Sequence, residues 1–255
     1  MENVYRPLAS TMFRALNRRL FAIAAMAAVA ALSAAGSAFA ADGAQGLLPY
    51  SVEYKTTARG MALKLNRKLE QNADGSFTLT NGGKIMVVGF HEMSVFSVDG
   101  SAIRPKSYVY QGTGLINRRR EVHFTPGAAT IRSLYKEQWY DLPYKEGTLD
   151  RMSQQEQVRL LLLNDPTPKE DILITVADGK RVKDYQLRYV GEETLNTPIG
   201  SLKTLHFERV HDDPGRKSDT WLAPELGYLM VKTVHIEDGK PTEAIVTKAS
   251  VGGKN

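Results

Sequence analysis

The chain contains no cysteine, and this absence excludes disulfides, thiol nucleophiles and cysteine-ligated metal centres. It also has no Gly-x-Ser-x-Gly nucleophile elbow. A Gly-x-Gly sequence occurs within residues 112–117, but it lacks the third glycine and the strand-to-helix setting of a dinucleotide-binding loop. The sequence therefore predicts no catalytic residue and no cofactor. A non-enzymatic protein is the favoured class, and an enzyme remains the alternative.

Histidine is scarce as well, with five residues scattered along the chain. Only His206 and His211 are close in sequence, and residues five apart on one strand point to opposite faces. Asp212 and Asp213 follow His211, but the Pro-Gly pair after them indicates a loop in which acidic side chains are solvated. We therefore predict no metal site.

The first forty residues hold a single acidic residue and have the layout of a cleavable secretory signal. Arg14, Arg18 and Arg19 form a basic segment, and residues 20–32 (LFAIAAMAAVAAL) form an uncharged apolar segment. That apolar segment is shorter than the ~20 residues that a membrane-spanning helix needs. We predict export, removal of residues 1–40, and no membrane segment in the mature form.

Small residues follow the apolar segment, as they do in front of a signal cleavage site. Ala38 and Ala40 form an A-x-A site just before Ala41. No cysteine follows that could carry a lipid anchor. The predicted location is the bacterial periplasm, with the mature chain soluble.

The sequence leaves two details of export open. Arg18 and Arg19 precede Phe21, which suits a twin-arginine signal, but a general secretory signal that contains two arginines looks the same. Translation can start at Met1 or at Met12. Each alternative leads to the same compartment.

Much of the positive charge belongs to the predicted signal. The net charge of the whole chain is +5, whereas residues 41–255 hold 29 basic and 27 acidic residues, a net charge of +2. This balance does not favour a nucleic-acid partner. About 215 residues suffice for one well-packed domain. We expect a single β-rich domain over residues 41–255, a loose tail at residues 250–255, and an oligomeric state that the sequence does not define.

Short runs rich in β-branched and aromatic residues fill most of this domain. Asp-Gly pairs at residues 74–75, 99–100, 178–179 and 238–239 separate several of them, and Asp-Gly suits type I′ hairpins because both residues can adopt positive φ. The run KIMVVGF at residues 84–90 is interpreted as one strand. Consecutive strands joined by hairpins predict an antiparallel sheet.

One helix is predicted at residues 153–164. Ser153 and Glu156 have the spacing of a capping box, and Pro166 after Asp165 ends the helix. Residues 160–163 are all leucine, so the helix is apolar on nearly every side and must be surrounded. The alternative is that Leu160 or Leu163 is exposed. We predict a mainly β fold in which a curved, incompletely closed, barrel-like antiparallel sheet wraps around one central α-helix.

A short basic run, NRRRE, occupies residues 117–121. On a strand, Arg118 and Arg120 share one face and Arg119 takes the other, so the charges do not form one patch. A solvated strand end is the favoured interpretation, and contact with an anionic lipid or polymer is the alternative.

The stretch DTWLAPELGYLMVKT at residues 219–233 joins two predicted strands. Trp221 ends the first strand, and Gly227 lets the chain turn into a second strand that begins at Tyr228. Structural anchoring is the favoured role. Trp221 and Tyr228 are also candidates for the wall of an apolar ligand cavity, because a large ring can pack while its polar end stays wet.

Several sequence blocks, taken in order, resemble those of the domain-of-unknown-function family 3108, a group of exported proteins of Gram-negative bacteria. The matching blocks are YSVEYK, GSAIRPKSYVYQ with Pro105 and Tyr108, REVHF, LDRMSQQEQVRLL with Asp150 and Ser153, NTPIGSLKTLHFER with Thr197, Pro198 and Gly200, and TWLAPELGYLMVK with Trp221, Pro224, Leu226 and Tyr228. Met230 stands where the family typically has proline. The resemblance implies an exported β-rich domain with one main helix, and it implies no activity or catalytic residue.

Three hypotheses of function follow from these observations. The first is a non-enzymatic role in the envelope: binding an apolar or amphipathic ligand such as a lipid or a lipoprotein segment. The second is a hydrolase acting on envelope polymers, with acids from loops such as residues 211–219. The third is a structural partner in an envelope complex. Leucines at residues 160–163 that filled the concave face would leave no room for a ligand.

Overall fold

The computed structural model describes residues 46–58, 61–115, 117–167 and 171–253. The predicted signal and its cleavage site at Ala38, Ala40 and Ala41 lie outside these residues. The strands are β1 (Tyr50–Ala58), β2 (Met61–Gln71), β3 (Phe77–Ile85), β4 (Val88–Asp99), β5 (Ala102–Gly114), β6 (Arg119–Phe124), β7 (Thr130–Tyr135), β8 (Gln138–Pro143), β9 (Ile172–Asp178), β10 (Arg181–Thr197), β11 (Gly200–Arg209), β12 (Arg216–Ala223), β13 (Leu229–Glu237) and β14 (Lys240–Val251). The helices are α2 (Ser153–Asn164) and the short 3₁₀ helix η1 (Pro224–Leu226).

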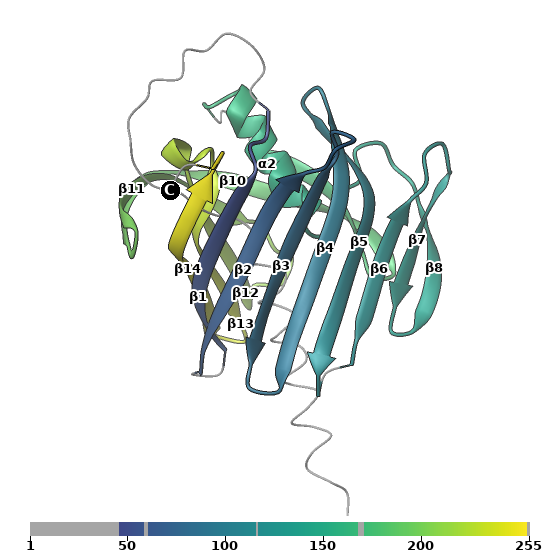
Figure 1. The fold of residues 1–255 in the computed structure, drawn as a ribbon, viewed down its shortest axis with the longest axis horizontal. Coiled ribbons are helices and arrows are strands. Elements are labelled where there is room, and N and C mark those ends of the chain that lie inside the picture. Colours follow the sequence, from purple (N-terminus) through teal and green to yellow (C-terminus); the bar gives the residue numbers. More distant parts are fainter. Residues whose placement is uncertain (1–45, 59–60, 116, 168–170, 254–255) are drawn as a thin grey trace, which may run out of the picture.

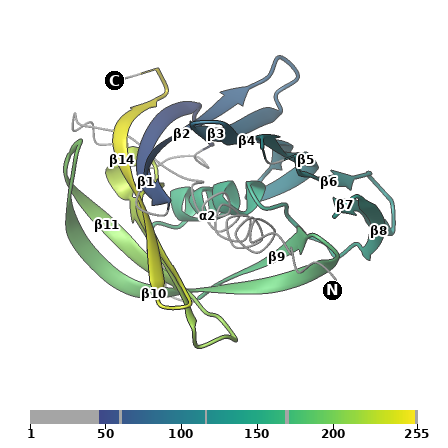
Figure 2. The same cartoon turned by 90° about the horizontal axis from the view of Figure 1, so that it is seen from below.

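All these strands belong to one antiparallel sheet with the order β8-β7-β6-β5-β4-β3-β2-β1-β14-β13-β12-β11-β10-β9. Each half is a meander, and β1 pairs with β14 to join the two halves. The sheet curves around α2, which lies within the curve (Figure 1, Figure 2). The predicted fold class and the predicted bounds of the helix are confirmed.

The two edges of the sheet meet at a short parallel bridge between Leu149, in the segment that connects β8 to α2, and Val176 of β9. The Leu149 N–H donates to the Thr175 carbonyl at 2.9 Å, and the Ala177 N–H donates to the Leu149 carbonyl at 2.9 Å. The sheet is therefore nearly closed into a barrel, and its seam is much shorter than its strand ladders.

Alternation along the strands separates an inner from an outer face. On β2, Leu63, Leu65 and Leu69 are buried, while Lys64 and Lys68 between them are exposed. The inner side chains of both meanders and the buried face of α2 form one contiguous apolar core.

The helix is only partly surrounded. Leu160 and Leu162 are buried, but Leu161 is 36% exposed, so the expectation of burial on every side is wrong. The alternative was that Leu160 or Leu163 is exposed, but the exposed leucine is Leu161. The sheet covers the face of α2 that carries Leu160 and leaves another face to solvent.

The helix starts with a different cap from the one expected. The Asp150 carboxylate accepts hydrogen bonds from the Met152 and Ser153 N–H groups at 2.7 and 2.9 Å, and the Ser153 hydroxyl accepts from the Asp150 N–H at 3.0 Å. This reciprocal pair is a capping box shifted three residues towards the N-terminus. The predicted Ser153–Glu156 box is wrong because Glu156 turns to buried arginines instead.

Two expectations about turns also need correction. Only Asp238 and Gly239 both have positive φ; the other three Asp-Gly pairs place only the glycine there. The run KIMVVGF is a hairpin, since β3 ends at Ile85 and β4 begins at Val88 with Met86 and Val87 at the turn. Met86 and Val87 are apolar and do not belong to the residue types that indicate a turn, so the sequence did not predict this hairpin.

The C-terminal segment is more ordered than expected. Ser250 and Val251 pair with Ser51 and Tyr50 on β1, and the Gly252 N–H donates to the Pro49 carbonyl at 2.8 Å. The prediction of a loose tail from residue 250 is therefore wrong for these residues.

Candidate functional site

A row of polar side chains crosses the inner face of the N-terminal meander. Arg67 pairs with Asn81, Asn81 with Glu92, Glu92 with Tyr110 and Tyr110 with Arg120 in successive strand ladders. Directly paired residues on adjacent strands point to the same face, so these five groups lie side by side. Arg67, Asn81 and Glu92 are each 1% exposed.

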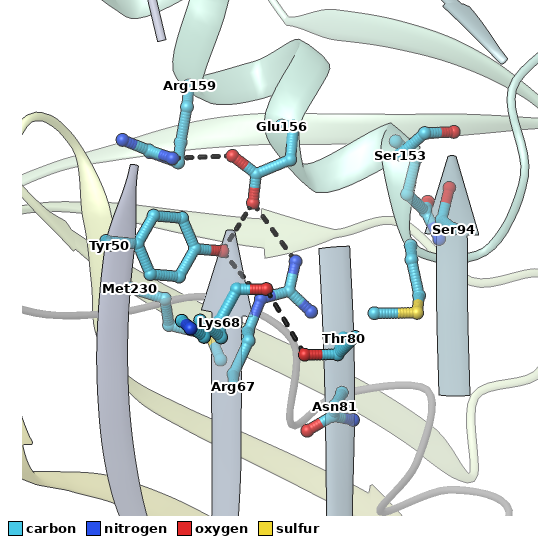
Figure 3. A network of polar contacts seen from close by, with 12 residues as sticks. Tyr50, Arg67, Lys68, Thr80, Asn81, Ser94, Ser153, Glu156, Arg159 and Met230 are labelled. Carbon is cyan, nitrogen blue, oxygen red and sulfur yellow. Dashed lines mark hydrogen bonds and ion pairs between the residues drawn. The ribbon is translucent and has the colours of Figure 1, made fainter. Parts of the chain in front are cut away.

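Arg67 belongs to a buried network that ties α2 to the sheet (Figure 3). One Glu156 carboxylate oxygen accepts from the Tyr50 hydroxyl at 2.7 Å and from Arg67 Nη2 at 3.1 Å. The other accepts from Arg159 Nη1 at 2.5 Å. Arg67 Nε also donates to the Tyr50 hydroxyl at 2.7 Å, and the Arg159 guanidinium lies 4.8 Å from the centre of the Tyr50 ring.

The charges of this network follow from its burial. Burial disfavours the Glu156 carboxylate, but Arg159 and Arg67 outweigh that effect and hold its pKa below the ordinary value. Burial raises the pKa of Tyr50 far above neutrality. One carboxylate thus faces two guanidiniums and a neutral phenol, which leaves a surplus of one positive charge.

The turn within residues 219–233 takes part in the same network. Arg159 Nε donates to the Gly227 carbonyl at 3.1 Å, and Gly227 has φ of 64° at the end of η1. A side chain at this φ is unfavourable, so glycine allows the turn that presents the carbonyl. The compact turn is therefore an anchor for the central helix.

Two buried polar atoms at the centre of the row have no protein partner among the described residues. They are Arg67 Nη1 and Asn81 Oδ1. Asn81 Nδ2 donates to Glu92 Oε2 at 3.0 Å, and the Tyr108 hydroxyl donates to Glu92 Oε1 at 2.7 Å. Burial raises the pKa of Glu92, more than the opposing effects of Arg151 and these hydrogen bonds lower it.

A second group of ion pairs includes Arg120, the last residue of the row. Asp178 lies between Arg151 Nη1 at 2.9 Å and Arg120 Nη1 at 3.3 Å. Burial opposes ionisation of Asp178, yet the two arginines hold its pKa below the ordinary value. Arg120 also lies 4.6 Å from the centre of the Tyr135 ring. Again one carboxylate serves two guanidiniums.

The two residues proposed for a cavity wall are not brought together as expected. Trp221 lies on the outer face, where its ring stacks on His206 at 4.5 Å, its Nε1–H donates to Glu193, and Lys232 lies 5.3 Å from the ring centre. It therefore does not face the interior. Tyr228 is 9% exposed, and burial together with the charge of Asp165 raises its pKa.

The predicted loop at residues 211–219 contributes to a small cluster that no spacing rule indicated. The Ser218 hydroxyl lies 2.8 Å from His211 Nε2 and 2.8 Å from His235 Nδ1. Burial lowers the pKa of His211 to about 4 and lowers that of His235 as well. Both rings are therefore neutral near pH 7. Within the described part of the chain, no three histidine or acidic side chains come together as metal ligands.

The alternation of the strands contains a signal for the inner polar row. Arg67 continues the alternation of Leu63, Leu65 and Leu69, and Glu92 continues that of Phe90 and Phe96. A charged residue at an inward position of an alternating strand indicates a buried, partnered charge. The sequence carries no such signal for the partners of Glu156, because Tyr50 and Arg67 lie far from it in sequence.

Comparison with known proteins places the chain in a family and supports its architecture. No helix in the described residues is long and apolar enough to cross a membrane. No curated protein sequence matches the chain. The family model described as "Protein of unknown function (DUF3108)" matches residues 50–241.

Three solved structures resemble the fold at low sequence identity. A β-barrel-like protein of domain of unknown function DUF1849 from Brucella abortus is similar with a TM-score of 0.54 and 10% identity, over 80% of this chain and 98% of that one. Pseudomonas aeruginosa MucB in its complex with MucA is similar with a TM-score of 0.35 and 13% identity, over 81% of this chain and 53% of that one. A protein with a YmcC-like fold from Bacteroides fragilis is similar with a TM-score of 0.31 and 10% identity, over 80% of this chain and 96% of that one. Only the first score is high enough to support the barrel-like architecture, and the family match over most of the described residues shows that this chain belongs to the DUF3108 family.

Proposed function

We propose that the inner face of the sheet binds an amphipathic ligand of the cell envelope, with an anionic head group at Arg67 and Asn81 and an apolar part along the core. The protein would act as a non-enzymatic binding or carrier protein in the periplasm after removal of residues 1–40. The observation that carries the proposal is a buried donor next to a buried acceptor, Arg67 Nη1 and Asn81 Oδ1, neither of which has a protein partner among the described residues.

Two ion-pair groups on the inner face each place one carboxylate beside two guanidiniums. Glu156 serves Arg67 and Arg159, and Asp178 serves Arg120 and Arg151. A buried charge is costly unless it is paired and hydrogen-bonded. An anionic ligand that accepted a hydrogen bond from Arg67 Nη1 would satisfy this buried donor with a charge-assisted bond.

The surroundings of this position suit the rest of such a ligand. Leu65, Leu79 and Phe96 are fully buried on the same inner face. Asn81 Oδ1 adds an acceptor that could bind a hydroxyl or amide of the head group. Pockets for small ligands typically combine such apolar walls with a few placed polar groups.

Entry to a buried site requires part of the sheet to separate. The seam between β8 and β9 is the weakest junction in hydrogen-bond terms, because the bridge at Leu149 replaces a full ladder. Local opening generally occurs where few hydrogen bonds must break. We infer that the ligand enters at this seam.

Native mass spectrometry tests the proposal directly. The form that accumulates when the full chain is expressed in a Gram-negative host would be purified without detergent, and its adducts would be extracted and weighed. We expect one stoichiometric adduct of amphipathic character. A clean protein mass that stays unchanged after incubation with envelope lipids would contradict the proposal.

Two inner variants and one matched outer variant locate the site. Arg67→Lys removes a hydrogen bond to the charged head group, which contributes about 1.5–3 kcal/mol, so retention should weaken about tenfold or more. Asn81→Leu removes a hydrogen bond to a neutral group, which contributes about 0.5–1.5 kcal/mol, so retention should weaken up to about tenfold. Asn66→Leu makes the same substitution at an exposed position of β2 and should retain the adduct fully. Circular dichroism would confirm that each variant is folded. Equal loss in Asn66→Leu would contradict this location.

A hydrolase is the second candidate, and the Ser218 cluster is the observation that favours it. A serine hydroxyl 2.8 Å from two neutral histidines has the start of a nucleophile–base arrangement. A fluorophosphonate probe followed by peptide mapping would test it. Covalent labelling of Ser218, lost in Ser218→Ala, would support hydrolysis, and an unlabelled protein would remove this candidate.

A further inference from the structure

The turn between β3 and β4 and the end of β5 lie at the end of the sheet opposite α2 (Figure 1), and they carry exposed apolar residues. Met86 and Val87, at the turn between β3 and β4, are 80% and 58% exposed, and Leu115, just after β5, is 64% exposed. The Leu115 N–H donates to the Val87 carbonyl at 3.2 Å, so the two segments are adjacent. We call these three residues the apolar tip.

The backbone of the apolar tip is unfavourable for the residues that it carries. Met86 has φ of 50°, in the left-handed region where turns normally have glycine or asparagine. Beside it, Gly114 has φ of 73°, and a Cβ there would lie 1.7 Å from the Val87 carbonyl oxygen. The close approach of the Gly114 and Val87 backbones therefore fixes the conformation of the apolar tip. A bulky apolar side chain that is both strained and exposed adds nothing to folding, which points to a role outside the fold.

Basic residues flank the apolar tip. Lys84 is exposed on β3, two residues before Met86. Arg118 and Arg119 follow Leu115, and the Gly112 N–H donates to the Arg118 carbonyl at 2.7 Å, which holds this segment against β5. The Arg119 side chain is 50% exposed, with Glu121 as its partner at 2.5 Å. The surface thus combines apolar side chains at its end with cations beside them.

We propose that the apolar tip docks on the surface of a bilayer that contains anionic lipids. Met86, Val87 and Leu115 would enter the boundary between head groups and acyl chains, while Lys84 and Arg119 contact lipid phosphates. Exposed apolar residues flanked by Lys and Arg are the features by which proteins bind such interfaces. The favoured occupant is a membrane and not a protein because the exposed charged side chains beside the tip, Lys84 and Arg119, are basic, whereas the Glu121 side chain is only 13% exposed.

Docking of this kind is independent of ligand binding at Arg67. The apolar tip and the inner polar row share no residue. A failure of either proposal therefore leaves the other intact.

Vesicle co-sedimentation tests the docking. The form that accumulates on expression of the full chain would be mixed with vesicles of phosphatidylcholine alone, or with about one third phosphatidylglycerol. We expect binding to the anionic vesicles, weaker binding to the neutral ones, and a decrease as salt screens the charges. Absence of binding to anionic vesicles would overturn the proposal.

The variant Met86→Gly with Val87→Ser removes two of the apolar side chains and places glycine where φ is positive. It should therefore fold at least as well as the wild type, while its affinity for anionic vesicles falls about tenfold or more. Leu173→Ser is the matched control, because Leu173 is 73% exposed on β9, away from the apolar tip. An equal loss in Leu173→Ser, or full binding by the tip variant, would contradict the proposal. Capture of a protein by the tip in place of vesicles would also overturn it.

Discussion

Two clusters in this molecule are built from the same kinds of side chain and sit on opposite faces of one sheet. The inner cluster joins Glu156 to Arg67, Arg159 and Tyr50, and the side chains of its ion pairs are at most 1% exposed. The outer cluster joins Trp221 to His206, Glu193 and Lys232, with the Glu193 side chain 43% exposed.

The difference shows that position decides what such a cluster does. On the outer face, water competes with every contact, so ion pairs contribute little to stability. On the inner face, no water replaces a lost partner, and each removed group leaves a buried charge behind. The inner cluster therefore fixes the place of α2, whereas the outer one covers the sheet.

Glu156→Gln should have the largest effect on the free energy of unfolding. The change leaves Arg67 and Arg159 buried without a carboxylate, and breaking a buried pair in this way typically costs about 3–5 kcal/mol. Urea unfolding followed by circular dichroism would measure it. Glu193→Gln is the matched outer change and should cost between about 0 and 1 kcal/mol. Similar costs for the two variants would contradict the comparison.

Asp150→Ala should rank next, because it removes the carboxylate that caps α2 and accepts from Ser94. Loss of such a cap costs up to about 2 kcal/mol. Burial raises the pKa of Asp150 above its ordinary value. Asp150→Asn keeps one acceptor oxygen and should cost clearly less in the same unfolding assay. Equal costs for asparagine and alanine would contradict this expectation, because they would show that the remaining acceptor oxygen does not replace the carboxylate.

The pH dependence should reveal the cluster around Ser218. The pKa of His211 is about 4 in the folded protein, below its ordinary value of 6.5, because of burial and the nearby cations Arg209 and Arg216. Between these two values the unfolded chain binds more protons, so the free energy of unfolding should fall as the pH drops from about 6.5 towards 4. In His211→Gln this fall should be shallower. An unchanged slope in that variant would contradict the shift.

Trp221→Phe should have the smallest effect. It removes the hydrogen bond to Glu193 but keeps an aromatic ring beside His206, and surface changes of this kind usually stay within about 0.5 kcal/mol. Thermal unfolding would measure it. A loss of several kcal/mol would mean that Trp221 belongs to the core after all.

The sequence was sufficient for the fold class and the helix because both depend on local patterns. Alternation marks strands, and the apolar run ending at Asp165 and Pro166 marks the helix. The face occupied by Trp221 was not determined by such a pattern, since β12 has a bulge between Trp221 and Leu222 that breaks the alternation. A preference for burying tryptophan placed it on the wrong side.

The candidate site was less predictable because its contacts are long-range. Glu156 lies 106 residues from Tyr50 and 89 from Arg67. At the sequence level, Ser153 with Glu156 looked like a local cap, and only the curvature of the sheet brings the arginines to the helix. The inward alternation at Arg67 and Glu92 could have indicated buried charges, but not their partners.

A high-resolution crystal structure of the protein purified without detergent tests the central claim most directly. We predict non-protein density within hydrogen-bonding distance of both Arg67 Nη1 and Asn81 Oδ1, continuing along the apolar wall of the inner face. A single bridging water molecule at that position, with protein side chains filling the rest, would satisfy both atoms. That result would contradict the proposed ligand site and would leave the inner row as a device for holding α2.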